Sequence, residues 1–359
     1  MKSIRDIQDL KDKRVLLRVD FDVPVSNGQI QEDFKIKKQK ETIDYLAKAG
    51  AKIIMVAHSS DASSLSAILP QLHILLGREI GFVKTLDDME EYLNSYPEVG
   101  LLENIRSFQG ETENSKDFAS RLAMPFDIYV NNAFAVCHRV HASIVAVTEH
   151  LPSYAGFLVE EETRSLSKAL EAPPEGKIVI MGGAKTATKI PSIKNFLTKA
   201  ETILLGGVIA NDAVALRGYN IRKSVVDPNY KELFEGIDMS SEKIVVPHDF
   251  AVGDDMILDI GKETINLYID FISKAKMIIW NGPLGQFENE TFAIGTNAIA
   301  KAISESRAYK IAGGEDTVTA IDRIGLLKKF DFVSTGGGAM LDFLAGKELP
   351  GLNALGYGK

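Results

Sequence analysis

The chain has 359 residues, of which 45% are hydrophobic and 25% charged, and its formal net charge is -8. This length predicts about two domains, each large enough for its own core. The acidic balance argues against a general nucleic-acid binder, because no basic excess is available to neutralise a phosphate backbone.

The sequence also indicates where the protein works. The polar N-terminus lacks the apolar segment of a signal peptide, and the longest apolar runs are too short to cross a bilayer. Cys137 is the single cysteine, so one chain cannot form a disulfide. We therefore expect a cytoplasmic protein without a membrane partner.

The first half of the chain alternates strand and helix patterns. The expected strands are Arg14–Arg18, Ala51–Ala57, Val99–Leu102 and Asp127–Val130. The expected helices are Lys37–Ala49, Leu65–Leu76, Ser115–Leu122 and Leu158–Leu170. Strands that alternate with helices of this length predict a parallel sheet with helices on both faces.

A linker at Glu171–Gly176, which contains Pro173 and Pro174 between charged residues, separates the halves. The second half repeats the alternation, with expected strands at Lys177–Met181, Thr202–Leu205, Lys243–Val246, Met277–Trp280, Lys310–Ala312 and Phe332–Val333. The sequence thus predicts two α/β domains in series.

The stretch Met181–Ile190 (MGGAKTATKI) joins an expected strand to an expected helix near the middle of the chain. Apolar residues at helical spacing predict the helix over Lys189–Ala200. Thr188 would be its N-cap, and Pro191 would fall in the first turn, where a missing N–H costs little.

The glycine turn in this stretch is a candidate anion site. Gly182 and Gly183 let a ligand approach the backbone closely, and the helix start offers free N–H groups. Lys185 and Lys189 flank that position. The pattern favours phosphate binding, although it is not a Walker A loop. The alternative is a plain βα turn whose lysines face solvent.

The two halves differ in the residues at the carboxyl ends of their strands, where parallel sheets bind ligands. The second half carries glycine pairs at 182–183, 206–207 and 313–314 and a glycine triplet at 336–338. The first half carries polar and charged side chains: Arg18, Asp20, His58, Asn104, Arg106, Asn131 and Asn132. Backbone N–H groups suit a nucleotide, whereas cationic side chains suit a small anionic substrate. Two such faces joined by a hinge would carry group transfer across a cleft.

Two further features favour nucleotide chemistry in the second half. The glycine N–H groups of Ser334–Ala339 (STGGGA) would make a nest for terminal phosphates, although Leu341 rules out a dinucleotide fingerprint. Asp316 is a candidate for holding Mg²⁺ directly or through water. The alternative is that Asp316 caps a helix over Thr317–Ile324.

In the first half, Arg106 and Arg139 are the best candidates for gripping an anion, because arginine forms bidentate pairs with carboxylate and phosphate. The alternative is that each is an ordinary surface charge. The run Cys137–His141 (CHRVH) suggests a metal site, but no further cysteine is present to complete it, so we expect no zinc there.

Together these stretches resemble the phosphoglycerate kinase family nearly from end to end. The matching segments are Arg18–Pro24 (RVDFDVP), Leu101–Arg106 (LLENIR), Asn131–Ser143 (NNAFAVCHRVHAS), Gly182–Ile190 (GGAKTATKI), Trp280–Glu288 (WNGPLGQFE), Gly313–Thr317 (GGEDT), Ser334–Ala339 (STGGGA) and Lys347–Leu355 (KELPGLNAL). Their order is the order of the family.

The resemblance implies a reversible, Mg²⁺-dependent phosphoryl transfer of glycolysis, from 1,3-bisphosphoglycerate to ADP, which gives 3-phosphoglycerate and ATP. It implies two Rossmann-like parallel-sheet domains joined by a hinge helix, with an open cleft between them. Residues 1–157 would bind phosphoglycerate, 158–176 would form the interdomain helix and linker, and 177–345 would bind the nucleotide. Residues 346–359 would be a tail that returns to the N-terminal domain. A monomer is the family expectation.

The resemblance also implies site residues. The substrate site would comprise Arg18, Asp20, Asp22, Lys35, His58, Arg106 and Arg139. The nucleotide site would comprise Gly183, Lys185, Lys189, Gly206, Gly207, Asn281, Glu288, Gly313, Asp316, Thr317, Gly336, Gly337 and Gly338. Among these, Glu288 would hold the ribose and Asp316 the metal. The catalytic residues would be Arg18, Lys35, Lys185, Lys189, Gly336 and Gly337, which stabilise charge on the transferring phosphoryl without a covalent intermediate.

The chain departs from the family pattern mainly in the substrate half. Asp22 stands where the family has Asn, and Lys35 stands for an arginine whose fork it cannot reproduce. Asp61 replaces a substrate-site arginine, and a carboxylate about 4 Å from a substrate anion costs on the order of 1–4 kcal/mol. In the nucleotide half, Val208 and Glu315 replace glycines.

These departures leave two alternatives, a kinase of the same fold that acts on another acid and a non-catalytic nucleotide-binding paralogue. A dehydrogenase is the weakest hypothesis, because no strand–G-x-G-x-x-G–helix unit is present.

Overall fold

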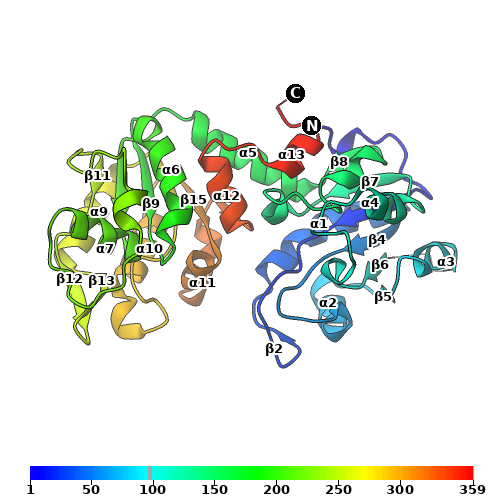
Figure 1. Ribbon diagram of the computed structural model, residues 1–359, viewed down its shortest axis with the longest axis horizontal. Helices are drawn as coiled ribbons and strands as arrows, with labels where there is room; N and C mark the ends of the chain where they lie inside the picture. Colours follow the sequence, from blue (N-terminus) through cyan, green and yellow to red (C-terminus); the bar gives the residue numbers. More distant parts are fainter. Residues whose placement is uncertain (96–98, 359) are drawn as a thin grey trace. The chain divides into compact units, whose positions relative to one another are not determined.

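The computed structural model of the chain describes residues 1–95 and 99–358 and separates into two compact units. Unit 1 is formed by Met1–Arg164 and Glu348–Lys359, and unit 2 by Ser165–Lys347. Each unit contains one six-stranded sheet with helices packed against it (Figure 1). Among the described residues, no helix has both the length and the apolar character that crossing a bilayer requires.

The sheet of unit 1 is parallel throughout, in the order β5-β6-β4-β1-β7-β8. Its strands are β1 (Arg14–Arg18), β4 (Lys52–Val56), β5 (Ile80–Val83), β6 (Val99–Leu102), β7 (Ile128–Asn131) and β8 (Ser153–Ala155), and a separate hairpin is formed by β2 (Val25–Ser26) and β3 (Gln29–Ile30). The helices are α1 (Phe34–Lys48), α2 (Leu69–Leu76), α3 (Asp88–Ser95), α4 (Lys116–Ala123) and α13 (Pro350–Ala354), together with the 3-10 helices η1 (Ile4–Asp6), η2 (Leu65–Ala67), η3 (Ile105–Ser107), η4 (Phe134–Val136) and η5 (Ala146–Glu149). Helix α5 (Phe157–Glu171) contributes residues to both units.

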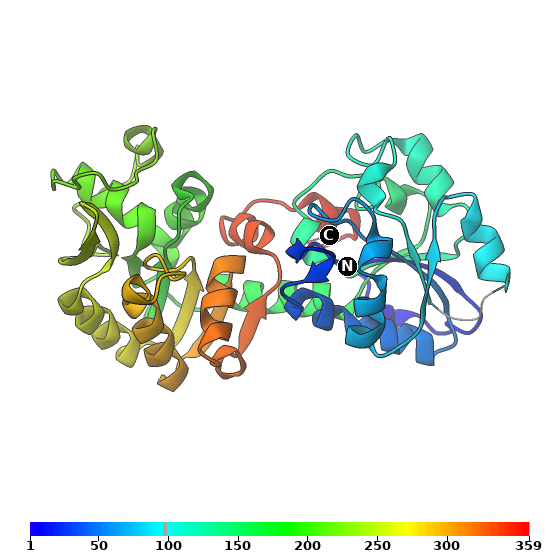
Figure 2. The same cartoon turned by 90° about the horizontal axis from the view of Figure 1, so that it is seen from below.

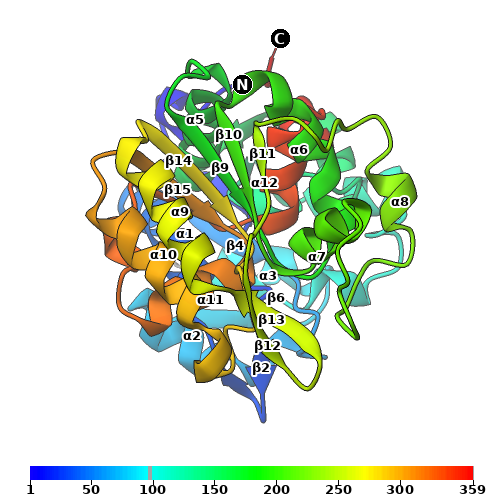
Figure 3. The same cartoon turned by 90° about the vertical axis from the view of Figure 1, so that its left-hand side faces the viewer.

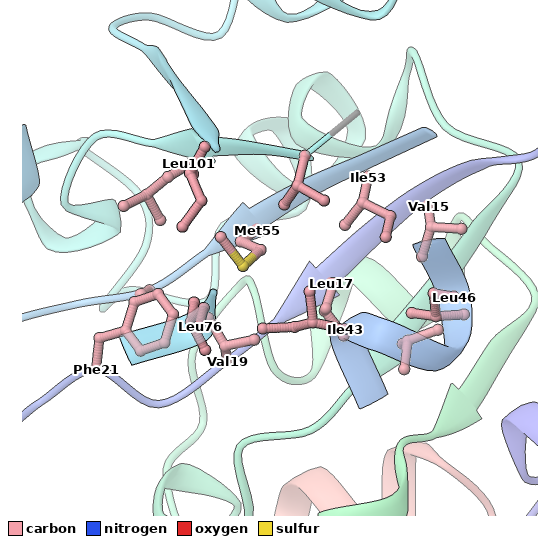
Figure 4. Packing of buried hydrophobic residues seen from close by; sticks show 14 of the residues in the cluster. Val15, Leu17, Val19, Phe21, Ile43, Leu46, Ile53, Met55, Leu76 and Leu101 are labelled. Carbon is pink, nitrogen blue, oxygen red and sulfur yellow. The ribbon is translucent and has the colours of Figure 1, made fainter. Parts of the chain in front are cut away.

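The largest labelled cluster of core residues in unit 1 lies between one face of the sheet and helices α1 and α2 (Figure 4). Val15 and Leu17 of β1 alternate with residues of the other face, so both point toward α1, where Ile43 and Leu46 meet them. The labelled members of this cluster are all 0% exposed. Burial of this apolar face is what fixes the register of β1 against its neighbours.

Both ends of the chain belong to unit 1. The N-terminal ammonium of Met1 donates to the carbonyl of Gly356 at 2.8 Å, and the two termini lie side by side (Figure 2). The backbone N–H of Gly351 donates to Cys137 O at 2.8 Å. A Cβ at Gly351 would lie 2.7 Å from the side chain of Ile144, so glycine allows the last helix this close approach.

The sheet of unit 2 is also parallel, in the order β11-β10-β9-β14-β15-β16. Its strands are β9 (Lys177–Met181), β10 (Thr202–Leu205), β11 (Ile244–Val245), β14 (Met277–Asn281), β15 (Tyr309–Gly313) and β16 (Phe332–Ser334), and β12 (Phe250–Gly253) pairs with β13 (Met256–Ile260) in an antiparallel hairpin. The helices are α6 (Thr186–Lys199), α7 (Gly207–Leu216), α8 (Tyr230–Leu233), α9 (Lys262–Lys274), α10 (Ile294–Glu305), α11 (Glu315–Arg323) and α12 (Gly337–Leu344), with the 3-10 helices η6 (Glu290–Phe292) and η7 (Leu327–Lys329). Helices α6, α7 and α12 cover one face of this sheet, and α9 and α10 cover the other (Figure 3).

The α/β class with a parallel sheet in each half is confirmed, and each strand predicted from an apolar run is present. Strands β5 and β8 and both hairpins were not predicted. Strands β2, β3 and β8 have three residues or fewer, and β5 carries Gly81 between apolar residues, so none offers a long apolar run.

The predicted start of the helix after Met181 was wrong. Helix α6 begins at Thr186, so Thr188 is not its N-cap, and its hydroxyl instead donates to the carbonyl of Lys185 at 2.8 Å. Pro191 lies inside the helix rather than in its first turn. Its ring permits a helical φ, and its missing N–H leaves the carbonyl of Ala187 without its helical partner.

The packing of α1 gives a direct test of this fold. Ile43 is 0% exposed in the core, whereas Ile74 on α2 is 80% exposed. We expect Ile43→Ala to lower the free energy of unfolding by about 2–5 kcal/mol, because it removes buried methyl groups and leaves a cavity. The matched variant Ile74→Ala should change it by less than about 0.5 kcal/mol. Urea unfolding measures both, and equal effects would contradict the assigned face of α1.

Candidate active site

The strand ends of unit 2 are level with one another. Met181 pairs with Leu205 on one side and Asn281 on the other. Asn281 in turn pairs with Gly313, which pairs with Ser334. The loops after these strands therefore share one edge of the sheet, and they contain the glycines that the sequence singled out.

Four helices begin directly after these strands, and none of their N-cap residues makes a side-chain capping bond. The N-caps are Lys185 for α6, Gly206 for α7, Gly314 for α11 and Gly336 for α12. The first N–H groups of α7 are satisfied by neighbouring loops, since Val208 N donates to Gly183 O at 3.0 Å. The starts of α6, α11 and α12 present N–H groups and positive dipole ends that suit an anion.

Two glycines at this edge are required by close packing of backbone. Gly207 has φ +57°, and a Cβ there would lie 2.6 Å from the backbone N of Gly183. Gly183 itself has φ +83°, and a Cβ there would lie 3.3 Å from Nζ of Lys189. The two glycine loops therefore touch one another, and Nζ of Lys189 lies beside Gly183.

Lys189 differs from the other lysine at this edge in being buried. It is 7% exposed, and it has no hydrogen-bond or ion-pair partner among the described residues. Burial lowers the pKa of Lys189, Asp316 acts to raise it, and Lys185 lowers it further. Because a buried cation without a partner is costly, the site is suited to an incoming anion. Lys185, by contrast, is exposed.

Asp316 is not the N-cap of its helix, so that alternative was wrong. Helix α11 is capped by Gly314, whose φ of 94° leads the chain into a helix that starts at Glu315. Asp316 therefore lies in the first turn with an exposed carboxylate that acts electrostatically on Lys189. Thr317 is 0% exposed, and its hydroxyl accepts from Gly282 N at 2.6 Å, which holds the turn after β14.

A cavity of about 440 Å³ adjoins this edge within unit 2. Its walls are mainly apolar, and they include Val208, Val225, Ile257, Leu284 and Phe287. Gly183, Gly207, Glu288 and Asp316 also line it, so the cavity is in contact with the glycine loops. An apolar cavity lined by a few polar groups is typical of a site for a small organic molecule.

In unit 1, Arg18 is buried and largely occupied by internal partners. It is 1% exposed at the end of β1. Its Nε donates to Ser143 Oγ at 3.0 Å, its Nη1 donates to the carbonyls of Val19 and Val56, and its Nη2 donates to His58 Nδ1 at 3.2 Å. Because most of its N–H groups are used inside the protein, this guanidinium contributes its positive charge to the site and cannot offer a ligand two free parallel N–H groups.

The contact with Arg18 fixes the tautomer of His58. A guanidinium only donates, so Nδ1 accepts and Nε2 carries the proton, which it donates to Asp22 Oδ2 at 3.1 Å. Burial lowers the pKa of His58, and Arg18 adds to that effect against the opposing influence of Asp22. Burial acts to raise the pKa of Asp22, but hydrogen bonds from His58 and Ser60 hold it below its usual range.

The carboxylates that depart from the family pattern have partners within unit 1. Asp22 Oδ1 accepts from Ser60 N at 2.7 Å, in addition to its contact with His58. Asp61 Oδ2 accepts from Val25 N at 3.1 Å, at the start of the β2-β3 hairpin. Lys35 Nζ donates to the carbonyl of Asp22 at 3.0 Å, so it lies beside the same loop.

Arg106 combines burial with unused hydrogen-bonding capacity. Its Nη1 donates to Ser60 Oγ at 3.3 Å, whereas its buried Nη2 has no hydrogen-bond partner among the described residues. Burial lowers the pKa of Arg106, and the neighbouring charge of Arg139 lowers it further. Arg139 is exposed. Two arginines near enough to influence each other, one with an unsatisfied N–H, suit an anion.

Sequence reasoning missed His141, Glu111 and Ser143, which lie behind these arginines. Glu111 is 0% exposed, and it accepts from Ser143 N at 2.9 Å and from Ser143 Oγ at 2.6 Å. His141 lies 3.8 Å from Glu111, and burial followed by Arg106, Arg139 and Arg18 lowers the pKa of His141 to about 4. His141 was noted only as part of a doubtful metal motif, and nothing near Glu111 in the sequence indicates its place.

Asp20 and Cys137 are two further buried residues of unit 1 near these side chains. Asp20 is 1% exposed; its Oδ1 accepts from Asp22 N at 3.1 Å, and its Oδ2 has no hydrogen-bond partner among the described residues. Cys137 is fully buried, and burial raises the pKa of its thiol to about 12, so the group is protonated at neutral pH.

Comparison with known proteins gives one consistent family. The family model for phosphoglycerate kinase matches residues 4–347. The phosphoglycerate kinase of Dictyoglomus turgidum is 42% identical over 393 positions, which cover 99% of this chain and 98% of the relative. That of Thermosipho africanus is 40% identical over 391 positions, which cover 98% of this chain and 97% of the relative.

Solved structures agree with these relatives. The phosphoglycerate kinase of Pyrococcus horikoshii superposes with a TM-score of 0.91 at 31% identity, covering 99% of this chain and 98% of that one. The enzyme of Coxiella burnetii superposes with a TM-score of 0.85 at 32% identity, with the same coverage.

The arginine cluster makes a testable prediction for His141. Replacing Arg139 by glutamine removes a positive charge that disfavours the imidazolium, so the pKa of His141 should rise from about 4 to roughly 5. It should not return to the ordinary value, because burial is the larger influence. Proton NMR titration of the His141 imidazole measures this pKa. Arg121→Gln, on an exposed arginine of unit 1, should leave it unchanged; an equal shift in both variants would contradict the cluster.

Proposed function

The chain belongs to the phosphoglycerate kinase family and has the phosphotransferase function of that family, with a carboxyl group as acceptor; on this basis we propose how its two units divide the work. Unit 2 binds ADP or ATP, and unit 1 binds 1,3-bisphosphoglycerate or 3-phosphoglycerate. The reaction is the reversible transfer of a phosphoryl group between the two ligands. The observation that carries the proposal is Lys189, which is 7% exposed, has no hydrogen-bond or ion-pair partner among the described residues, and has its Nζ beside Gly183.

In unit 2, the transferring phosphoryl lies near Lys189 and Lys185. The N–H groups at the starts of α6, α11 and α12 share one edge of the sheet with these lysines, so negative charge that develops in the transition state meets fixed donors. Gly336, Gly337 and Gly338 form the start of α12 and contact the phosphates through their backbone. No covalent intermediate is needed.

The base and sugar of the nucleotide occupy the apolar cavity. Its lining by Gly183, Gly207, Val208 and Leu284 suits a flat heteroaromatic ring, and Glu288 at its rim accepts from the ribose hydroxyls. Asn281 is nearly buried with its amide beside Gly314, where a Cβ would lie 3.1 Å from Nδ2. That placement suits a contact with the phosphates between the cavity and α11.

Asp316 is the residue that we propose for Mg²⁺. No group of three or more His, Cys, Asp or Glu that could hold a metal occurs among the described residues. Mg²⁺ in nucleotide sites is held by one or two carboxylates together with phosphates and water, so a single exposed carboxylate fits an ion that arrives with the nucleotide. When bound, the ion neutralises charge on the phosphate chain.

In unit 1, Arg106 and Arg139 grip the anionic groups of the substrate. The unsatisfied Nη2 of Arg106 donates to the ligand, and exposed Arg139 adds a second cation. Arg18 contributes its charge through His58, and Lys35 lies beside Asp22 at the same loop. Asp22 and Asp61 each accept a hydrogen bond from within unit 1. Their presence therefore does not require that an acid other than 3-phosphoglycerate accept the phosphoryl group.

We further propose the arrangement that the family suggests for the whole chain. Residues 1–157 form the phosphoglycerate-binding domain, 158–176 the interdomain helix and linker, 177–345 the nucleotide-binding domain, and 346–359 a returning tail. Hinge bending closes the site against water, which would otherwise compete for the phosphoryl group. The protein acts as a monomer in the cytoplasm.

A coupled assay of ATP-dependent phosphorylation of 3-phosphoglycerate tests this function. Lys189→Ala should lower kcat by at least about a hundredfold, because it removes a cation placed for the transition state. Lys194→Ala, on an exposed lysine of the same helix, should leave kcat within about twofold.

Failure of the unaltered chain to turn over 3-phosphoglycerate would contradict the proposal. So would equal kcat values for the two lysine variants.

A further inference from the structure

Asp212 of α7 is a buried carboxylate that the proposed chemistry does not use. It is 0% exposed, and both of its oxygens accept hydrogen bonds. Oδ2 accepts from the hydroxyl of Thr186 at 2.5 Å, and Oδ1 accepts from the backbone N–H of Asp227 at 2.9 Å. Burial raises the pKa of Asp212 to about 6, and these two bonds act against that rise. Burying a carboxylate is costly, so its place in the fold calls for an explanation.

One partner of Asp212 is the first residue of the helix that carries both lysines. Thr186 is 0% exposed and lies between Lys185, the N-cap of α6, and Lys189 in the next turn. Lys185 makes no side-chain capping bond. Pro191 cannot donate to the carbonyl of Ala187, so the first turn lacks one of its own bonds. The Thr186–Asp212 hydrogen bond is therefore an anchor for this helix start.

The other partner of Asp212 belongs to a wall of the apolar cavity. Asp227 follows closely on Val225, which lines the cavity and is 60% exposed. The neighbouring residue Asn211 also holds this segment, because its Nδ2 donates to the carbonyl of Val225 at 3.0 Å. Successive residues of α7 thus attach the cavity wall on one side and the start of α6 on the other.

We propose that Asp212 is a positioning residue that joins the nucleoside cavity to the phosphate-binding lysines through Thr186. It touches neither substrate nor cofactor. Through it, the cavity wall and the first turn of α6 hold one relative placement, so a base that fits the cavity finds Lys185 and Lys189 set for its phosphates. The inference rests on the nucleotide site proposed above and names one of its determinants.

The test separates nucleoside binding from phosphate binding. Thr186→Val keeps the size of the side chain and removes its donor, while Asp212 still holds Asp227. By calorimetry, adenosine affinity should stay within about twofold, whereas ADP affinity and kcat should each fall by about tenfold. Thr186→Ser restores the hydroxyl and should recover both. Thr198→Val, at an exposed threonine near the far end of α6, should change nothing.

Each result decides the matter. If Thr186→Val retains ADP affinity, loses adenosine affinity equally, or is not rescued by serine, the positioning role is overturned while the nucleotide site stands. If the unaltered chain binds no ADP, the proposed function fails and this inference fails with it. Should Thr186→Val not fold, Thr186→Cys retains a weak donor and should show the same division to a smaller extent.

Discussion

Both candidate sites depend on the level carboxyl ends of the parallel strands. In unit 2 the pairing of Met181 with Leu205 and Asn281 brings the loops after these strands to one edge. In unit 1 Arg18 is paired with Val56 and Asn131 in the same way, which puts the polar residues after these strands at a single edge. The strands are buried on both faces, so a shift of one register would place each core side chain in packing that fits another; apolar burial therefore fixes where the strand ends lie.

The two candidate anion sites differ in the groups that they offer. Unit 2 offers backbone, with helix starts after glycine loops, and Lys189, a buried residue that has no hydrogen-bond or ion-pair partner among the described residues. Unit 1 offers side chains, in which most donors of Arg18 are used by internal acceptors and Arg106 keeps a buried N–H unsatisfied. Arg18 fixes the neutral tautomer of His58, and the unsatisfied N–H of Arg106 is suited to an anionic ligand.

Much of this could be predicted from the sequence, because long apolar runs identify buried strands and glycine pairs identify close backbone approach. The placement of Lys189 beside the glycine turn followed from that pattern. The features that could not be predicted depend on contacts between distant segments. Glu111 meets Ser143, Asp61 meets Val25, and Asp212 meets Thr186, and no local pattern records such partners. The same reason explains why Thr188 was wrongly predicted as the N-cap of α6. The contact of Thr186 with Asp212 holds a helix start two residues before Thr188.

Separate calorimetric titrations test most directly whether each unit binds its own ligand. The unaltered chain, Arg106→Gln and Lys189→Ala would each be titrated with 3-phosphoglycerate and with ADP. We predict that Arg106→Gln weakens only 3-phosphoglycerate binding and that Lys189→Ala weakens only ADP binding, each by about tenfold or more. Either variant weakening both ligands equally, or the opposite ligand, would contradict this division between the units.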